Sequence, residues 1–386
     1  MKYWRGYLVA AILAAFTWGF REIAATHTKL VDMIYPYITR LVQNFMTGWS
    51  SGVDFCVWQA ILLALVVAAF ASIVLMIIFR WNPIQWFGWI LAVASLILLL
   101  HTGIYGMNAY AGDLADDIRL MKADCSQEQM EQAAIYYRDM ANELAEEVDR
   151  NSDGSAKALS LDRLNQDAVS GFHNLVYKKY YSVFAGTTLP VKALDMADFF
   201  TSKGHMGVTV PITGEAAVNL QAPGVMLPFA VSREMCYRMS IASEADKHFG
   251  AFLACQASDS EAFRYSGYVM AYYYCLEALA DSRASTVAAQ ASSSVRKDVQ
   301  AWEAFIAPFD ESKTMENQIA EVMKTQPETN SPMEIARLLV RWHQQEIVIP
   351  SITEPEIEFD PMDETQVDLT GLPHGPKPTE PTEAAA

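Results

Sequence analysis

The residues best suited to chemistry lie in one stretch, residues 227–255, where carboxylate and imidazole side chains stand among apolar ones. Glu234 could serve as a general base, and Glu244 and His248 are four residues apart, so they would share one face of a helix. With Glu234 and a remote residue, that face could hold a divalent metal, which usually needs three protein ligands. A helical Glu/His pair is more often a solvated face or a local hydrogen bond, so these residues alone favour no metal site.

A cysteine nucleophile is the other chemistry to weigh. The chain has five cysteines and no C-x-x-C pair. Cys236 would need a neighbouring basic group to become a reactive thiolate, and the sequence identifies none. We therefore expect each cysteine to be a small buried hydrophobic residue, and in an oxidising compartment the spacing would not select a disulfide. The residues concerned are Cys56, Cys125, Cys236, Cys255 and Cys275.

Composition excludes several classes of function. The 386 residues are 52% hydrophobic and carry 45 acidic against 28 basic side chains, a net charge of -17. Residues 1–104 have a net charge of +3 and the remainder -20, and so acidic a part repels nucleic-acid phosphates. The chain has no Walker loop, no dinucleotide fingerprint and no G-x-S-x-G elbow. We therefore expect no nucleic acid, no nucleotide and no serine-hydrolase chemistry.

Three apolar segments predict a membrane domain over residues 1–104. The first is short, so it is either a signal peptide or a retained spanning helix. We favour a retained helix, because Lys2, Arg5 and Arg21 can reach the two interfaces. The second and third segments, joined by the link 80–83, are predicted to form a tight helical hairpin. The predicted spans cover residues 6–22, 55–79 and 84–104. The second and third are long enough to cross a bilayer, and the first is long enough if its flanking basic side chains snorkel to the interfaces.

Basic residues set the predicted orientation of these spans. The short segments that hold Lys2, Arg5 and Arg80 contain no acidic residue, so we place them in the cytoplasm and the C-terminal domain outside. The connector 30–46 has apolar residues near helical spacing around a Tyr-Pro-Tyr break. It is either an amphipathic helix in the membrane interface or a packed connector. We therefore expect a multi-pass integral protein of the cell membrane, with the lipid membrane as a partner.

The remainder is predicted to be a mainly helical domain, residues 105–348, followed by an acidic, Pro-rich disordered tail, residues 349–386. Only residues 207–219 show strand alternation with a glycine turn, which suggests one short hairpin or ribbon. The tyrosines of residues 265–274 are spaced to bury one helix face. Helical periodicity covers residues 113–149, 161–181, 232–257, 261–281, 293–307 and 315–345.

Five stretches, spread over nearly the whole chain apart from the tail, carry a family resemblance. In chain order they are IYPYITRLV, Gly106-Met107-Asn108, GVTVPITGEAAVN, FGAFLAC and FRYSGYVMAYYYCLEAL. In this order they resemble an uncharacterised bacterial family of membrane-anchored proteins described as zinc metallopeptidases. That family has three N-terminal transmembrane helices and a C-terminal domain with an HExxH motif. The resemblance implies a zincin-like helical domain with a peptide-binding cleft.

At the family's HExxH motif this sequence has Arg233, Glu234 and Tyr237. In the motif, two histidines four residues apart bind zinc, and the glutamate activates the metal-bound water. Arg233 stays cationic and cannot bind a metal, and Tyr237 could bind one only as a phenolate. Glu234 remains at the general-base position but is expected to be idle. The resemblance thus implies a degenerate peptidase with no metal or cofactor, where the family has zinc.

The third zinc ligand of the family corresponds to Glu244 or Asp246. Because a lost metal would leave carboxylates unpaired, we expect Arg233 to pair with one of these two residues. The resemblance also implies a strand along the cleft, where an extended peptide could add to the sheet edge. A hairpin that only covers the core is an equal alternative. The strand consists of Gly207, Val208, Thr209 and Val210.

The leading hypothesis is a catalytically inactive membrane protein that binds a peptide or a protein partner, if it acts at all. The first alternative is an active zinc peptidase with unusual metal ligands, which stoichiometric zinc and chelator-sensitive cleavage would reveal. The second alternative is a structural membrane protein unrelated to peptidases. That alternative predicts that residues 232–255 do not form two helices beside a cleft.

Overall fold

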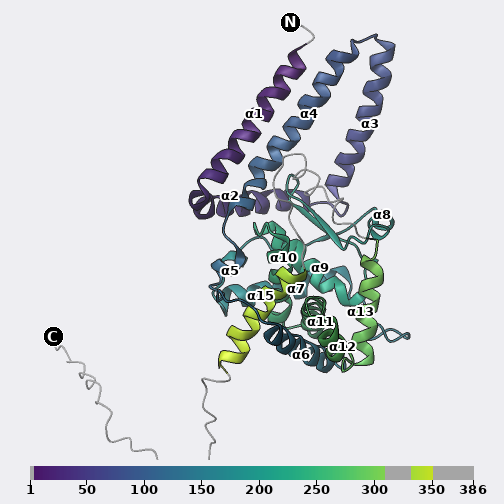
Figure 1. Cartoon of the computed structure of the whole chain (residues 1–386). Helices are drawn as coiled ribbons and strands as arrows, with labels where there is room; N and C mark the ends of the chain where they lie inside the picture. Colours follow the sequence, from purple (N-terminus) through teal and green to yellow (C-terminus); the bar gives the residue numbers. More distant parts are fainter. Residues whose placement is uncertain (1–3, 309–331, 351–386) are drawn as a thin grey trace, which may run out of the picture.

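A computed structural model describes residues 4–308 and 332–350. The fold is mainly helical, as predicted, with apolar N-terminal helices standing on a helical domain that contains one small sheet (Figure 1). The predicted tail, residues 349–386, lies outside the described residues except for its first two. The first part of the helix predicted for residues 315–345 also lies outside them.

Among the residues that the structure describes, three helices are long and apolar enough to span a membrane: α1 (Arg5–Thr26), α3 (Val57–Ile78) and α4 (Pro83–Ile104). Each has 22 residues, which at 1.5 Å per residue gives a length of about 33 Å, sufficient for a hydrocarbon core. α1 and α4 run toward the domain, and α3 runs away from it (Figure 1). The start of α1 and the α3–α4 turn therefore lie at the end of the spans far from the domain.

The packing of the spans differs from the tight α3–α4 hairpin predicted. α4 packs along α1, and a Cβ added to Gly6 would lie 2.5 Å from the backbone carbon of Gly88. Small residues let these two backbones approach closely. α3 leans away from α4 (Figure 1), and none of its most apolar stretch is buried. The two helices are joined by their turn and by a hydrogen bond of 3.1 Å from Trp86 Nε1 to Ser72 Oγ.

Helix α2 (Thr28–Ser50) crosses the domain-side ends of the spans (Figure 1). It continues through Pro36, so the predicted Tyr-Pro-Tyr break is wrong. Proline removes a single backbone donor, which costs the helix one hydrogen bond but does not end it here. Buried residues recur along α2 about every four positions, so they lie along one side of the helix, and this side packs against the domain. They are Val31, Tyr35, Thr39, Gln43, Thr47 and Ser50.

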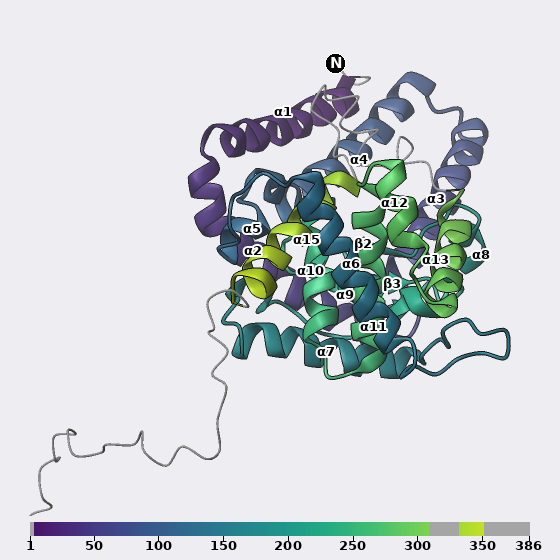
Figure 2. The same cartoon turned by 60° about the horizontal axis from the view of Figure 1, so that its bottom comes forward.

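The helices of the domain agree with the predicted regions, and residues 113–149, whose pattern fits either one long helix or a helical pair, contain two helices. A core of buried apolar side chains joins α6, α9, α10, α11 and α15, which gather at the centre of the domain in Figure 2. Of the predicted tyrosines, Tyr265, Tyr268, Tyr272 and Tyr274 are buried. The helices are α5 (Leu114–Asp117), α6 (Gln127–Leu144), α7 (Leu161–Tyr177), α8 (Ala197–Thr201), α9 (Leu227–Arg238), α10 (Glu244–Ala257), α11 (Glu261–Glu277), α12 (Asp281–Ala288), α13 (Ser293–Ile306) and α15 (Pro332–His343).

The sheet has three strands in the order β1-β3-β2. β2 (Gly207–Val210) and β3 (Glu215–Val218) form the predicted hairpin, and the two-residue β1 (Lys192–Ala193) adds to β3 in parallel. Gly214 ends the hairpin turn with φ of +67°, a conformation that favours glycine. β2 is therefore an edge strand.

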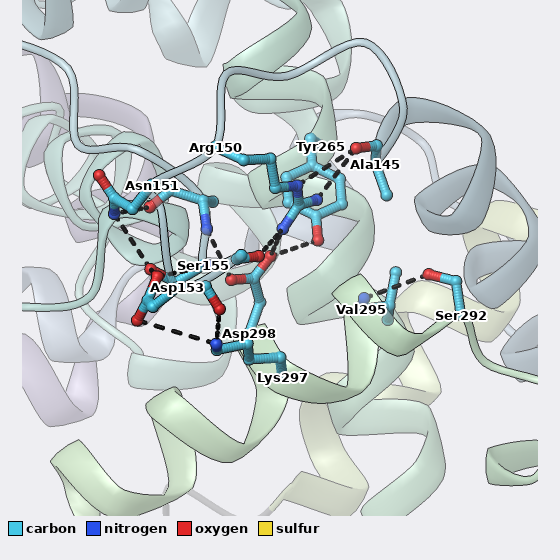
Figure 3. A network of polar contacts seen from close by, with 12 residues as sticks. Ala145, Arg150, Asn151, Asp153, Ser155, Tyr265, Ser292, Val295, Lys297 and Asp298 are labelled. Atoms are coloured by element: carbon cyan, nitrogen blue, oxygen red, sulfur yellow. Dashed lines mark hydrogen bonds and ion pairs between the residues drawn. The ribbon is translucent and has the colours of Figure 1, made fainter.

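A polar network fixes the loop after α6 to α11 and α13 (Figure 3). Arg150 pairs with Asp298 at 2.6 Å, and its guanidinium lies 5.1 Å from the ring centroid of Tyr265. The Tyr265 hydroxyl donates to the same carboxylate at 2.6 Å. Asp298 is buried, and these partners compensate the cost of removing its charge from water. The network is structural and lies apart from the residues of the predicted site.

The sheet is joined to the membrane helices at the start of α3. The buried side chain of Glu215 accepts the backbone N–H groups of Val57 and Trp58, each at 2.8 Å. Lys192 pairs with Glu215 at 2.7 Å and also donates to the backbone carbonyls of Ser50, at the end of α2, and Phe55, in the α2–α3 loop. Free N–H groups and the helix dipole favour an anion at a helix start. Glu215 thus caps α3 from within the domain.

Candidate functional site

The predicted site residues lie on α9 and α10, which pack against each other, with β2 and β3 against α9. α9 begins with Pro228 in its first turn, where the missing N–H costs nothing. α10 begins after Ser243, whose side chain accepts the N–H of Asp246 as an N-cap. Between them Ser240 has φ of +71°, so the chain reverses within a few residues. This reversal brings the first turn of α10 beside the middle of α9.

Arg233 lies between two carboxylates. Its guanidinium pairs with Glu234 and, at 2.5 Å, with Glu244. Lys247 also pairs with Glu244, and the Thr209 hydroxyl donates to Glu234 at 2.6 Å. The side chains of Glu234 and Lys247 are each 2% exposed, and those of Arg233 and Glu244 are 17% and 16% exposed, so the cluster is largely shielded from water. The structure thus brings Arg233 to the first of the two carboxylates expected as its partner.

These ion pairs hold both partners in their charged forms. Burial by itself would lower the pKa of Arg233, but Glu244 and Glu234 outweigh it and raise that pKa. Burial would likewise raise the pKa of Glu244, and the cations Arg233 and Lys247 bring it well below its ordinary value instead. A buried ion without its partner strongly destabilises a fold. Removing any one charged member of the cluster should therefore lower the stability of the protein.

Asp246 faces away from Arg233. Its carboxylate accepts the N–H of Leu114 at 3.2 Å and lines a cavity of about 290 Å³ between α2, residues 108–117 and residues 240–246. Burial raises its pKa to about 7, against the hydrogen bond from Leu114 and with a contribution from Asp113. Residues two apart point to different sides of a helix, so Glu244 and Asp246 cannot share one partner. Of the two expected carboxylates, Glu244 alone pairs with Arg233.

Tyr237 lies one helical turn after Arg233 on α9 and contacts the end of the third span. Its ring stacks on that of Tyr105, with centroids 4.4 Å apart. Lys247 Nζ lies 4.3 Å from the Tyr237 ring centroid, a cation–π geometry. The Tyr105 hydroxyl donates to the carbonyl of Ile241 at 2.8 Å. The residues just after α4 are therefore in direct contact with α9.

His248 does not form the metal face weighed from the sequence. Its Nδ1 lies 2.8 Å from the backbone carbonyl of Glu244, and its ring packs near Phe229 and Tyr274. Burial, helped by the charge of Arg233, lowers its pKa to about 4, so the ring is neutral. Within residues 4–308 and 332–350, no group of three or more His, Cys, Asp or Glu side chains could hold a metal ion.

Cys236 is also unsuited to nucleophilic chemistry. It is fully buried, and burial raises the pKa of its thiol well above the ordinary value. A thiolate is the reactive form, so this thiol is inert. All five cysteines are free thiols, and no disulfide is present among them.

β2 passes directly over Glu234. A Cβ added to Gly207 would lie 2.8 Å from Glu234 Cγ, so the close approach requires glycine. The Asn219 N–H donates to the Met206 carbonyl at 2.7 Å. This hydrogen bond determines which residues of β2 direct their backbone N–H and C=O groups toward β3 and which direct them away from it. The backbone groups of Gly207 and Thr209 therefore point away from β3, toward the sheet edge. The predicted strand is thus an edge strand that lies against Glu234.

Sequence reasoning missed three members of this region: Lys247, Tyr105 and Arg238. Lys247 follows Glu244 by three residues on a helix, which is a usable signal for an ion pair. Tyr105 is remote in sequence from Tyr237, and no local pattern connects them. Arg238 is fully buried, and burial lowers its pKa to about 10. Its Nε and Nη1 have no hydrogen-bond partner in the described part of the chain.

Comparison with known proteins identifies the family but no activity. Residues 31–326 match the family described as "Protein of unknown function (DUF3810)", and the chain belongs to this family. The matched region begins in α2 and includes α3, α4 and most of the domain. No curated protein and no solved structure matches the chain.

Proposed function

We propose that this protein is a membrane-anchored, zinc-metallopeptidase-like protein that has lost its metal site and acts by binding a peptide or protein segment. The position of Arg233 carries this proposal. Its guanidinium contacts both Glu234 and Glu244, which match the general-base and third-ligand positions of the metallopeptidases that the sequence resembles. An arginine would thus stand where a metal cation would bridge these groups.

The residues around Arg233 do not suit zinc. Lys247 places a second positive charge on Glu244, beside that of Arg233. Zinc normally takes four ligands, at least three of them from the protein at a catalytic site. Cations on both available carboxylates would repel the metal, so the proposed function includes no metal-dependent hydrolysis.

The edge of β2 is the proposed binding surface. The backbone groups of Gly207 and Thr209 point outward, so an extended segment could add to the sheet as a further strand. β2 lies against α9, beside the degenerate motif, as the edge strand of a peptidase cleft would. An extended peptide or a protein segment in that conformation is therefore the proposed class of partner.

The orientation in the membrane is part of the same proposal. Arg5 and Arg80 flank the spans at the end far from the domain (Figure 1), and the positive-inside rule would put that end in the cytoplasm. We therefore propose an extracytoplasmic domain. The close packing of α1 on α4 at Gly6 and Gly88 supports a retained first helix over a cleaved signal peptide.

Metal content tests the proposal. Zinc per chain would be measured by elemental analysis on the detergent-purified protein, before and after dialysis against zinc. The same measurement would be made on Arg233→His/Tyr237→His, and on that variant with Lys247→Gln added to remove the second cation. We expect no zinc in the natural sequence, zinc approaching one per chain in the double variant, and tighter binding in the triple variant.

Tyr177→His is the matched control, because it adds a histidine four residues from His173 on the exposed side of α7, away from the carboxylates. It should bind zinc far more weakly than the double variant. Stoichiometric zinc in the natural sequence, with chelator-sensitive cleavage of casein, would establish the active peptidase instead. A folded triple variant that stays metal-free would show that the site geometry is not that of a peptidase.

Cross-linking tests the binding part of the proposal. Cross-linking from position 208 on β2, compared with position 180, would identify the bound segment.

A further inference from the structure

Helix α2 packs on the domain through its polar side. Gln43 Nε2 donates to the carbonyl of Pro211 at 3.0 Å, and Thr47 Oγ1 donates to the carbonyl of Gly214 at 2.6 Å. Both acceptors belong to the turn between β2 and β3. The buried residues include Thr39, Gln43 and Thr47. This pattern is the reverse of an ordinary surface helix, which buries its apolar side.

The opposite side of α2 is apolar and exposed. Leu41 and Phe45 are each 71% exposed, and Trp49 is 64% exposed. Leu30, Met33 and Ile38 continue this face toward the start of the helix. At 3.6 residues per turn, these positions lie on the side away from the stripe of Thr39, Gln43 and Thr47. A continuous apolar face of this size marks an interaction surface.

The location of α2 identifies what covers this face. α2 lies across the ends of α1, α3 and α4 on the side of the domain (Figure 1), which is where the hydrocarbon core gives way to lipid headgroups. Tyr37 and Trp49, both exposed on α2, are residue types enriched at that boundary. The apolar face is therefore continuous with the lipid-facing surface of the spans.

We propose that α2 is an in-plane interfacial helix whose outer face is embedded in the lipid bilayer, between headgroups and acyl chains. The polar side of α2 then contacts the domain, so the domain lies directly against the membrane. The hairpin turn at residues 211–214 is bonded to α2, so β2 and the Arg233 cluster are fixed close to the headgroups. This inference does not depend on the proposed function of the cluster.

Depth measurements on the full-length protein in phosphatidylcholine and phosphatidylglycerol vesicles test this proposal. Leu41→Cys and Phe45→Cys would each carry an environment-sensitive nitrobenzoxadiazole label, with the natural sequence labelled in parallel as the background. Phe70→Cys, 70% exposed in the middle of α3, is matched in exposure to Phe45 and reports the bilayer interior. Tyr180→Cys, 84% exposed on the domain, reports water.

At positions 41 and 45 we expect several-fold stronger quenching by lipids with a headgroup-proximal nitroxide than at position 180, and little quenching by iodide. Position 70 should respond best to a nitroxide near the chain end. Iodide quenching equal to that of position 180, without lipid quenching, would overturn the proposal. Protection from both quenchers that disappears on dilution in lipid would also overturn it, because a second copy would then cover the face.

Discussion

Tyr105 and Tyr237 stack with their ring planes 12° apart, which joins the end of the third span to α9. Tyr105 is almost wholly buried, and Tyr237 contacts it on one side and Lys247 on the other. The stack therefore belongs to both the membrane region and the candidate site. Contacts of this kind stabilise a fold beyond the apolar area that they bury.

A double-mutant cycle of Tyr105→Leu and Tyr237→Leu should show a coupling of about 1 kcal/mol in the free energy of unfolding. Each single variant loses the same stack, so the two losses should not add. Thermal or denaturant unfolding of the detergent-purified protein measures this. Tyr237→Phe keeps the ring and is the control, with an expected change well below that of Tyr237→Leu. Strictly additive losses would show that the stack contributes nothing.

Arg233→Met should lower the free energy of unfolding by about 3–5 kcal/mol, because it leaves buried carboxylates without their main cation. The matched control is Lys179→Met, which breaks a pair with Glu346 whose side chains are 51% and 22% exposed. A pair at the surface contributes about 0–1 kcal/mol, so this control should change little. Equal losses in the two variants would contradict the view of Arg233 as the centre of a buried cluster.

Asp246 should make the protein less stable as pH rises. Its pKa is raised from 3.8 to about 7, so the folded state holds the proton more tightly than the unfolded state. Its stabilising contribution is therefore complete below pH 3.8 and is lost as pH rises through about 7, with an upper limit of about 4 kcal/mol. Asp246→Asn keeps an oxygen acceptor for the Leu114 N–H but carries no charge.

Unfolding of Asp246→Asn, measured from pH 4 to pH 8, should accordingly show a flatter stability profile. The variant should be more stable than the natural sequence at the upper end. Glu146→Gln, at an exposed position, is the control and should leave the profile unchanged. A variant profile that keeps the full slope would assign the pH dependence to other groups.

Gly207→Ala should destabilise the protein by about 1–3 kcal/mol, because the new methyl group would overlap Glu234 Cγ and disturb its bonds to Arg233 and Thr209. Gly103→Ala is the matched control, since a Cβ there meets no atom within 4 Å. Alanine also favours helix over glycine, so this control should be neutral or slightly stabilising. Unfolding measurements on both variants test whether β2 rests on Glu234.

Local patterns predicted much of the fold. The spans follow from uninterrupted apolar length, and the β2–β3 hairpin follows from alternation around a glycine, both of which are properties of a short stretch. The close packing of α4 on α1 does not follow in this way, because it brings together Gly6 and Gly88, which are far apart in the sequence. The two-residue β1 is too short to leave a pattern of its own.

The candidate site was predictable where its residues lie on neighbouring helices. Arg233 and Glu244 are separated by one tight reversal, and the resemblance, in which the loss of a metal would leave a carboxylate unpaired, predicted their pairing. Asp246 was the alternative partner for Arg233. It is excluded because its side chain points to a different side of α10 from that of Glu244. Tyr105 entered the site through tertiary packing, which no spacing in the sequence encodes.

The cap on α3 has a consequence for how the protein is made. Glu215 closes the start of α3, yet it is synthesised long after that helix has left the ribosome. Until then the first N–H groups of α3 must be satisfied by water or by lipid headgroups. The membrane region can therefore insert first but reaches its final form only when the sheet has folded. A chain truncated before residue 215 would have three inserted helices, and the first N–H groups of α3 would lack the cap that Glu215 provides.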